Sequence, residues 1–293
     1  MRSNLHVLAA AGFCLGVSGA LPHHVLDAAT LRARRLPSTA AAVPANAPLP
    51  AQNAWKAARA VLNGVGIETG LGYSREARVH SALGVLGARV REQSHPQALR
   101  LAFEAYYNFK AAHPEKVRKP YLYFVDYGLD SRTPRGYVFD MEALRVVDGP
   151  FTVAHGRGSS SGRDGVPTRF SNRNGSAATS LGLFLAQETY SFTGHNSGRL
   201  YRSIGLRLTG LSGAFNNRAR SRGVVVHGAP YVAPDKAGRS EGCPAMEPGR
   251  AQELIPTLAN GALVFLFSPL DGAWLSEDPW AHGDSAEAGS ANG

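Results

Sequence analysis

The sequence has few cysteines, no internal repeat and no long apolar run after its N-terminus. Its 293 residues include only two cysteines, which excludes a framework of disulfide bonds. The missing apolar run excludes a protein that crosses the membrane several times. Charged residues make up only 18% of the chain and hydrophobic residues 44%, so the chain can form a core and is not disordered as a whole.

Glycine, proline and basic residues are plentiful. The 33 glycines and 18 prolines predict many turns, which favours strands and loops over a helical bundle. The 31 lysines and arginines exceed the 22 acidic residues, for a formal net charge of +9. The length suits one large domain or two small ones.

Residues 1–20 have the three parts of a secretory signal peptide. Arg2 supplies a positive charge, an apolar run follows, and the segment ends in small residues at 18–20. A short buried helix is the less favoured alternative. A lipid anchor at Cys14 is disfavoured because the bulky Phe13 precedes it. We therefore predict an exported protein of the periplasm or cell envelope, with no membrane span after cleavage.

The composition divides the rest of the chain into four segments. Residues 21–50 are rich in proline and alanine and predict a flexible linker. Residues 51–117 have a helical pattern interrupted by glycines, with the best helix at 96–112. Residues 118–270 predict the main domain. Residues 271–293 form an acidic tail, expected to be loose from about His282.

The main domain has the period-two pattern of β-strands. A short helix is expected to start near Pro248 and to end or kink at Pro256. The overall fold class is therefore mainly β with flanking helices (α+β). The predicted strands are 121–127, 136–142, 146–156, 181–187, 205–211, 223–228 and 262–267.

Cys243 is the best candidate for a reactive residue. After signal cleavage it is the only cysteine, and an unpaired thiol outside the cytosol is a liability unless it is buried or used. His227 closes an apolar strand 16 positions earlier, and imidazole is the usual base for a thiol nucleophile. Pro244 has no N–H, so an oxyanion hole would use Cys243 itself or preceding residues such as Gly242, in the loop with Ser240.

Each of these residues also has a structural interpretation. Cys243 could be an inert buried thiol, and His227 a hydrogen-bonded core residue. Six arginines and no acid lie between 199 and 222, which could be a solvated basic face or a surface that binds carboxylates. Arg222 and Arg239 are the best candidates for such binding.

Other ligands are less favoured. His155 precedes a glycine at a strand end and could line the same pocket as the thiol. Nucleic-acid binding is disfavoured by the predicted export and by the lack of a binding motif. Zinc binding is disfavoured because no HExxH or CxxC spacing occurs.

The segment GRSEGCPAM (238–246), with HGA at 227–229, resembles the active-site motif of the murein L,D-transpeptidase catalytic-domain family, the YkuD type. It is most similar to the branch whose motif is Gly-Arg-Ser-x-Gly-Cys-Pro. The resemblance covers roughly 95–270. Further matching segments are FVDY (124–127), VAHG (153–156), TRFSN (168–172), SLGLF (180–184) and GLSGAFNNRARSRGVVVHGAPY (210–231).

The resemblance implies a β-sandwich catalytic domain with an N-terminal helical segment. It implies that Cys243 is the nucleophile, His227 the general base, and the Gly228 carbonyl the group that orients the imidazole. The implied reaction is acyl transfer through a thioester on peptidoglycan stem peptides, with no metal or cofactor. The alternatives are an L,D-carboxypeptidase on the same scaffold and a non-catalytic peptidoglycan-binding module. The oligomeric state is left open.

One residue departs from the family's common pattern. Glu241 occupies the position of the histidine in the usual Ser-His-Gly-Cys motif. A carboxylate facing the thiol would raise the thiol pKa, whereas one facing away could contact an amine of the substrate.

Overall fold

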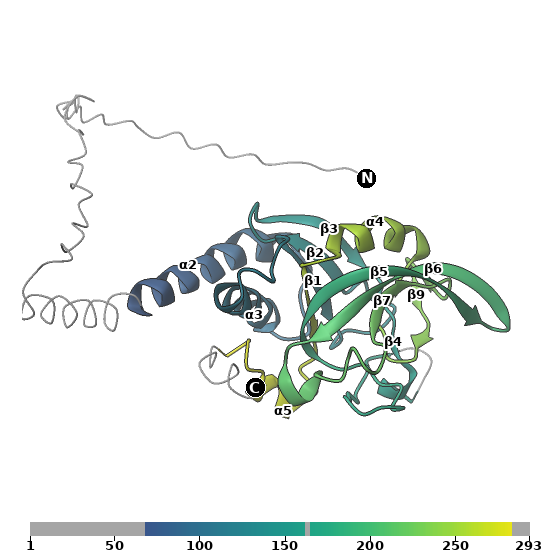
Figure 1. The fold of residues 1–293 in the computed structure, drawn as a ribbon. Helices are drawn as coiled ribbons and strands as arrows, with labels where there is room; N and C mark the ends of the chain where they lie inside the picture. The colour runs from purple at the N-terminus through teal and green to yellow at the C-terminus, as the bar shows by residue number, and fades with distance from the viewer. Residues whose placement is uncertain (1–67, 162–164, 283–293) are drawn as a thin grey trace, which may run out of the picture. The chain divides into compact units, whose positions relative to one another are not determined.

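An eight-stranded mixed sheet organises the protein (Figure 1). The computed structural model describes residues 68–161 and 165–282, which lie in one unit spanning 59–293. The strand order is β11-β7-β6-β5-β12-β1-β2-β3. The strands are β1 (Tyr121–Asp126), β2 (Gly136–Asp140), β3 (Arg145–Phe151), β5 (Gly182–Asn196), β6 (Arg199–Gly210), β7 (Val225–Gly228), β11 (Ala245–Met246) and β12 (Leu263–Phe267).

The middle of the sheet is apolar on both faces. β12 is buried at all five positions and β1 at five of its six, and the two strands pair in parallel with Phe124 opposite Phe265. Continuous apolar runs are typical of strands that are covered on both sides. Pro150 lies on β3, an edge strand of the sheet, which is the usual place for a proline within a sheet.

Helices cover the sheet at separate places (Figure 1). α3 (Ala98–Ala112) packs on β12 and β1, α2 (Glu68–Leu86) packs on α3, and α4 (Pro248–Leu258) packs on β7, β6 and β5. α3 agrees with the helix predicted at 96–112, and its Phe103 is fully buried, edge-on to Phe139 of β2. The glycine at 84 does not interrupt α2.

The hairpin of β5 and β6 is much longer than the sequence indicated. Its strands pair from Phe184 with Gly210 out to Asn196 with Arg199, and its outer half is largely exposed (Figure 1). The predicted strands covered only the buried inner parts. Polar residues and glycine in the outer half hid the strand pattern, because no core contact selects for apolar side chains there.

Two other predictions needed correction. The strand expected at 146–156 ends at Phe151 and resumes as the short β4 (His155–Gly156). The helix predicted to end or kink at Pro256 is α4, which ends two residues later at Leu258, because a proline in the last turn removes only one of the helix's hydrogen bonds.

The chain beyond residue 270 contributes to the core. α5 (Gly272–Glu277) is capped by the Asp271 carboxylate, which accepts from the Trp274 N–H. Trp274 and Trp280 are buried, and the Trp280 indole donates to the Leu211 carbonyl at 2.8 Å. This end of the chain is therefore attached to the sheet up to the last described residues.

The observed architecture confirms the predicted α+β class with an N-terminal helical segment. The predicted signal peptide, the linker and the tail from 283 lie outside the described residues, and the domain boundaries stay predictions. Within the described ranges, none of the helices has the length and apolar character needed to cross a membrane.

Two small sheets complete the fold beside the hairpin. β4 pairs in parallel with β10 (Arg239–Ser240), and β8 (Val232–Ala233) pairs with β9 (Lys236–Ala237). A Cβ added to Gly156 of β4 would overlap the Ala177 carbonyl oxygen and lie 2.7 Å from the Gly242 Cα. Gly156 therefore allows three segments of backbone to meet.

We predict that Gly156→Ala lowers the free energy of unfolding by about 1–3 kcal/mol, because the added methyl forces these segments apart. Gly87→Ala is the control, since a Cβ there meets no atom within 4 Å. Guanidinium unfolding of both variants measures the difference. A Gly156→Ala variant as stable as Gly87→Ala would contradict the packing argument.

Candidate active site

Cys243 lies in a turn whose two ends are both held by β pairing. On its N-terminal side, β10 pairs with β4, with Ser240 opposite Gly156. On its C-terminal side, β11 pairs in parallel with β7, with Ala245 opposite His227, and the His227 N–H donates to the Pro244 carbonyl at 3.2 Å. The backbone around Cys243 is thus placed directly beside the strand that carries His227.

The side chain of Ser240 closes the turn. Its hydroxyl donates to the Cys243 carbonyl at 2.6 Å and accepts from the Gly242 N–H at 3.1 Å. Gly242 has φ of +122°, a conformation that favours glycine, and a Cβ there would lie 2.9 Å from the Ala178 carbonyl oxygen. Because the Gly242 N–H is already bonded to Ser240, these two residues shape the turn, and the predicted oxyanion donor Gly242 is occupied.

His227 is buried at the end of β7, with 6% of its surface exposed. Its Nδ1 lies 3.1 Å from the Gly228 carbonyl oxygen. A carbonyl can only accept, so Nδ1 carries the hydrogen and Nε2 of the neutral ring has the free lone pair. Burial lowers the pKa of His227, and the Gly228 hydrogen bond acts in the opposite direction. The ring is therefore neutral and has the tautomer that a general base at Nε2 needs.

Ser203 of β6 is a contact that the sequence did not reveal. Its hydroxyl donates to the same Gly228 carbonyl at 2.9 Å, and its side chain is buried. The carbonyl that holds the imidazole is thus fixed from a second side. The register of β6 against β7 creates this contact, and no local motif announces it.

Cys243 and His227 line one cavity of about 440 Å³. Arg239, Ser240 and Glu241 also reach it. The outer half of the β5–β6 hairpin supplies much of the apolar wall, and His227 lies edge-on to Phe192 with ring centroids 5.6 Å apart. The aromatic residues of the wall are Tyr190, Phe192, Tyr201 and Tyr231.

The Cys243 thiol is partly buried and donates a long hydrogen bond to the Gly223 carbonyl at 3.8 Å. Burial raises the pKa of Cys243. The Val225 N–H and the Arg222 guanidinium lower that pKa, and the Glu241 carboxylate raises it. The resting cavity therefore holds a protonated thiol and a neutral imidazole, and forming the thiolate requires a transfer of the proton.

Arg222 is held too firmly to act as a free carboxylate receptor. Its guanidinium donates to the carbonyls of Ser171 and Ala178, each at 2.8 Å, and to the hydroxyls of Ser180 and Ser176, each at 3.2 Å. Burial lowers the pKa of Arg222, and the neighbouring Cys243 acts in the opposite direction. The geometry gives this cation an electrostatic influence on the thiol rather than the predicted contact with substrate.

Glu241 forms an ion pair with an arginine that lies outside the cysteine motif. Its carboxylate pairs with Arg157 at 2.7 Å, and both side chains are well exposed. Arg157 lies on the short helix η3 (Arg157–Ser159) that follows β4. The ion pair directs the carboxylate to this helix, although its charge still raises the pKa of Cys243.

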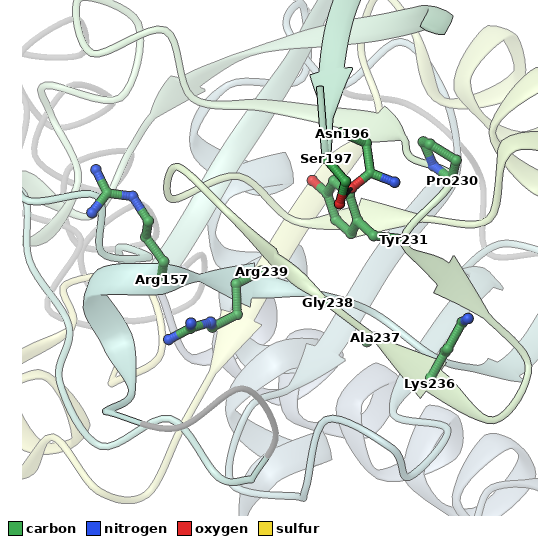
Figure 2. Close-up of a pocket in the computed structure, with 9 residues that line it drawn as sticks. All are labelled: Arg157, Asn196, Ser197, Pro230, Tyr231, Lys236, Ala237, Gly238 and Arg239. Atoms are coloured by element: carbon green, nitrogen blue, oxygen red, sulfur yellow. Dashed lines mark hydrogen bonds between the residues drawn. The ribbon is translucent and has the colours of Figure 1, made fainter. Parts of the chain in front are cut away.

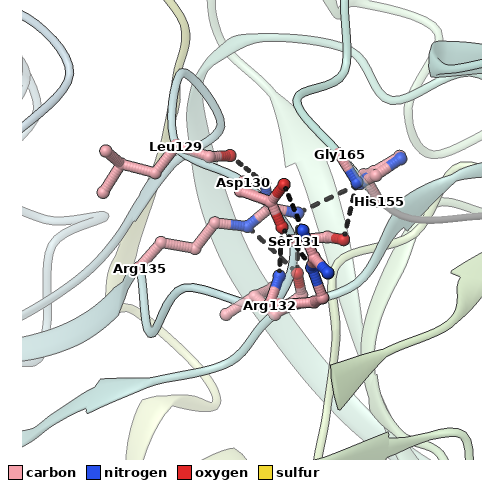
Figure 3. A network of polar contacts seen from close by, with 8 residues as sticks. Leu129, Asp130, Ser131, Arg132, Arg135, His155 and Gly165 are labelled. Carbon is pink, nitrogen blue, oxygen red and sulfur yellow. Dashed lines mark hydrogen bonds and ion pairs between the residues drawn. The ribbon is translucent and has the colours of Figure 1, made fainter. Parts of the chain in front are cut away.

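The structure does not bring His155 to the pocket, so its predicted role in substrate binding is not supported. His155 is fully buried beneath β10, and its Nδ1 lies 3.0 Å from the buried Arg135 guanidinium (Figure 3). Its Nε2 lies 2.9 Å from the Ser160 hydroxyl. Burial, with the charges of Arg135 and Arg239, lowers the pKa of His155 to about 3.

Residues 90–267, more than half of the chain, match the family model described as L,D-transpeptidase catalytic domain. The chain belongs to this family. No curated protein sequence matches it.

Solved structures of other L,D-transpeptidases are similar over part of this family member. An L,D-transpeptidase from Mycobacterium smegmatis is 15% identical with a TM-score of 0.31, over 50% of this chain and 58% of that one. One from Stackebrandtia nassauensis is 16% identical with a TM-score of 0.31, over 58% and 68% of the two chains. This L,D-transpeptidase family member thus matches less than two thirds of the first of these chains.

The charges around Cys243 predict how fast iodoacetamide alkylates its thiol. Arg222→Gln should slow alkylation at pH 8 several-fold because a charge that favours the thiolate is lost, and Glu241→Gln should accelerate it. Arg220→Gln, an exposed neighbour paired with Glu188, is the control and should not change the rate. The rate at Cys243 is read by peptide mass spectrometry. Equal rates in all three variants would contradict this assignment.

The buried His155 predicts a dependence of stability on pH. Its folded-state pKa of about 3 lies below the unfolded value near 6.5, so only the unfolded chain binds this proton between those values. Stability should be unaffected above about pH 6.5 and fall below it, by up to about 1.4 kcal/mol per pH unit from this group.

Urea unfolding at pH 7.5 and 4.5 measures the effect against His155→Gln, which lacks the titrating ring. We expect a smaller loss of stability in the variant at pH 4.5. A folded-state pKa of His155 near 6.5 by NMR would overturn the prediction even if the variant does not fold.

Proposed function

We propose that this protein is an exported, cysteine-dependent L,D-transpeptidase that acts on the stem peptides of bacterial peptidoglycan. The observation that carries the proposal is that Cys243 and His227 line one cavity, with the imidazole held by Gly228 in the tautomer of a base. Membership of the L,D-transpeptidase catalytic-domain family supports the same chemistry. The export follows from the predicted signal peptide and places the enzyme in the periplasm or cell envelope.

The first half of the reaction forms a thioester. His227 Nε2 takes the thiol proton as Cys243 Sγ attacks the carbonyl carbon of the third residue in the stem. The Cys243 N–H is the donor we assign to the developing oxyanion, since the Gly242 N–H is bonded to Ser240. The carbon–nitrogen bond then breaks, and the imidazolium returns its proton to the departing amine of the terminal D-alanine.

The second half of the reaction releases the enzyme. An amine of a neighbouring stem attacks the thioester carbonyl and loses a proton to His227, and the carbon–sulfur bond breaks to restore the thiol. Water in place of the amine would give a carboxypeptidase.

A neutral Cys–His pair matches this sequence of proton transfers. Burial favours the uncharged forms of both groups, as their opposite pKa shifts indicate. The bound substrate carbonyl drives the proton transfer, because attack by sulfur replaces the thiolate charge with a carbon–sulfur bond and an oxyanion, which the hydrogen-bond donor stabilises. Ser203 and Gly228 keep the imidazole in place during both halves.

The decisive experiment incubates the protein with purified tetrapeptide muropeptides and a D-amino acid. We expect exchange products or cross-linked dimers by mass spectrometry, and none with Cys243→Ala, because the thiol makes the covalent intermediate. Intact mass spectrometry should also show acylation of Cys243 by a carbapenem.

Other results have distinct meanings. Normal turnover by Cys243→Ala would show that the mechanism is wrong, and tripeptides alone would indicate a carboxypeptidase. Sacculus binding without turnover or acylation would indicate a binding module. The melting temperature of Cys243→Ala controls for loss of folding.

A further inference from the structure

A second hollow, of about 520 Å³, adjoins the Cys243 cavity (Figure 2). We call it the basic pocket. It lies between the tip of the β5–β6 hairpin at Asn196 and Ser197 and the segment of β9 and β10 from Lys236 to Arg239. Tyr231 and Arg239 line both cavities, so they form the border between them.

The basic pocket carries three cations and has no acidic residue in its lining: Arg157, Lys236 and Arg239. Arg157 is already paired with Glu241. Figure 2 shows Lys236 at the end of the pocket away from the two arginines. Of these three cations, only Arg239 also lines the Cys243 cavity.

Arg239 is half-buried, and its side chain makes no hydrogen bond or ion pair with any residue in the described ranges. Its backbone is fixed, because β10 pairs with β4 and places Arg239 opposite His155. A guanidinium that lines two open cavities can bind a ligand that carries negative charge. Arg222, by contrast, has all of its contacts within the protein.

We propose that Arg239 binds the carboxylate on the nitrogen side of the reacting bond, a role that rests on the proposed function. In the first half-reaction this is the terminal carboxylate of the departing D-alanine. In exchange it is the carboxylate of the entering D-amino acid, which takes the same place because attack by D-alanine is the reverse of its departure. With the reacting carbonyl at Cys243, the α-carbon of the D-amino acid separates the nitrogen from the carboxylate, which we place toward the border between the two cavities.

The chemistry of the two groups fits this assignment. Guanidinium and carboxylate form two parallel charge-assisted hydrogen bonds, which fix the orientation of the ligand as well as its position. The remainder of the basic pocket gives space for larger side chains of an entering amino acid. The selectivity proposed here is for the charge of the carboxylate and not for the side chain.

The test compares substrates that differ only in this carboxylate. Donor stems ending in D-alanine or D-alaninamide, and acceptors D-methionine or D-methioninamide, are used with the wild-type protein and Arg239→Gln. We expect the wild type to prefer the free acids by about ten- to hundredfold in kcat/KM. Arg239→Gln should lose most of this preference, because its rates with the acids should fall much further than its rates with the amides.

Arg202→Gln, which removes an exposed cation of the hairpin outside both cavities, is the matched control and should keep the preference. Arg239→Lys keeps the positive charge but not the two parallel N–H donors of the guanidinium. This variant should therefore recover part of the preference for the free acids. If Arg239→Gln lowers the rates with acid and amide equally, or if Arg202→Gln removes the preference as well, the proposed role is wrong.

A binding measurement separates this proposal from the proposed function. N-acetyl-D-alanine and N-acetyl-D-alaninamide are titrated into Cys243→Ala and followed by NMR. Binding of the acid alone, lost in Cys243→Ala/Arg239→Gln, would support the carboxylate site even if the wild type turned over no stem. Equal binding of both probes, or of neither, would overturn it even if the wild type were an active transpeptidase.

Discussion

The candidate site depends on two short parallel strand pairs that hold the Cys243 turn from both ends. β10 is attached to β4 and β11 to β7, so only Glu241 to Pro244 lie between two fixed segments. Ser240 then bonds to both Gly242 and Cys243 within the turn. A nucleophile needs a defined position more than it needs flexibility, because a displacement of about 1 Å is costly to catalysis.

The same constraint explains the buried charge beneath the site. β4 can support β10 only if its own position is fixed, and Arg135 fixes it by donating twice to the Val153 carbonyl and contacting His155. The buried guanidinium also lies over the Tyr127 ring, at 4.7 Å from the centroid. These contacts leave His155 neutral and make it a support of the site rather than a part of its surface.

Burial and charge have opposing effects on the thiol. Burial favours the protonated form, Arg222 opposes it, and Glu241 adds to it. The fixed position of Arg222 matters here, since four hydrogen bonds keep its charge near the thiol at little entropic cost. Arg239 differs because no residue of the described ranges forms a hydrogen bond or ion pair with its side chain, which leaves its guanidinium available to a ligand.

The sequence by itself determined the fold class, most of the buried strands, helix α3 and the choice of Cys243 and His227, because apolar periodicity and the motif are local properties of the chain. It did not determine the long hairpin or the contact of Ser203 with Gly228. Nor did it show that Arg222 is paired within the protein, that Arg239 lines the cavities, and that His155 is buried. Only the tertiary structure decided these, because strand register and chain packing determine which of several similar polar side chains are buried, which are paired, and which face a cavity.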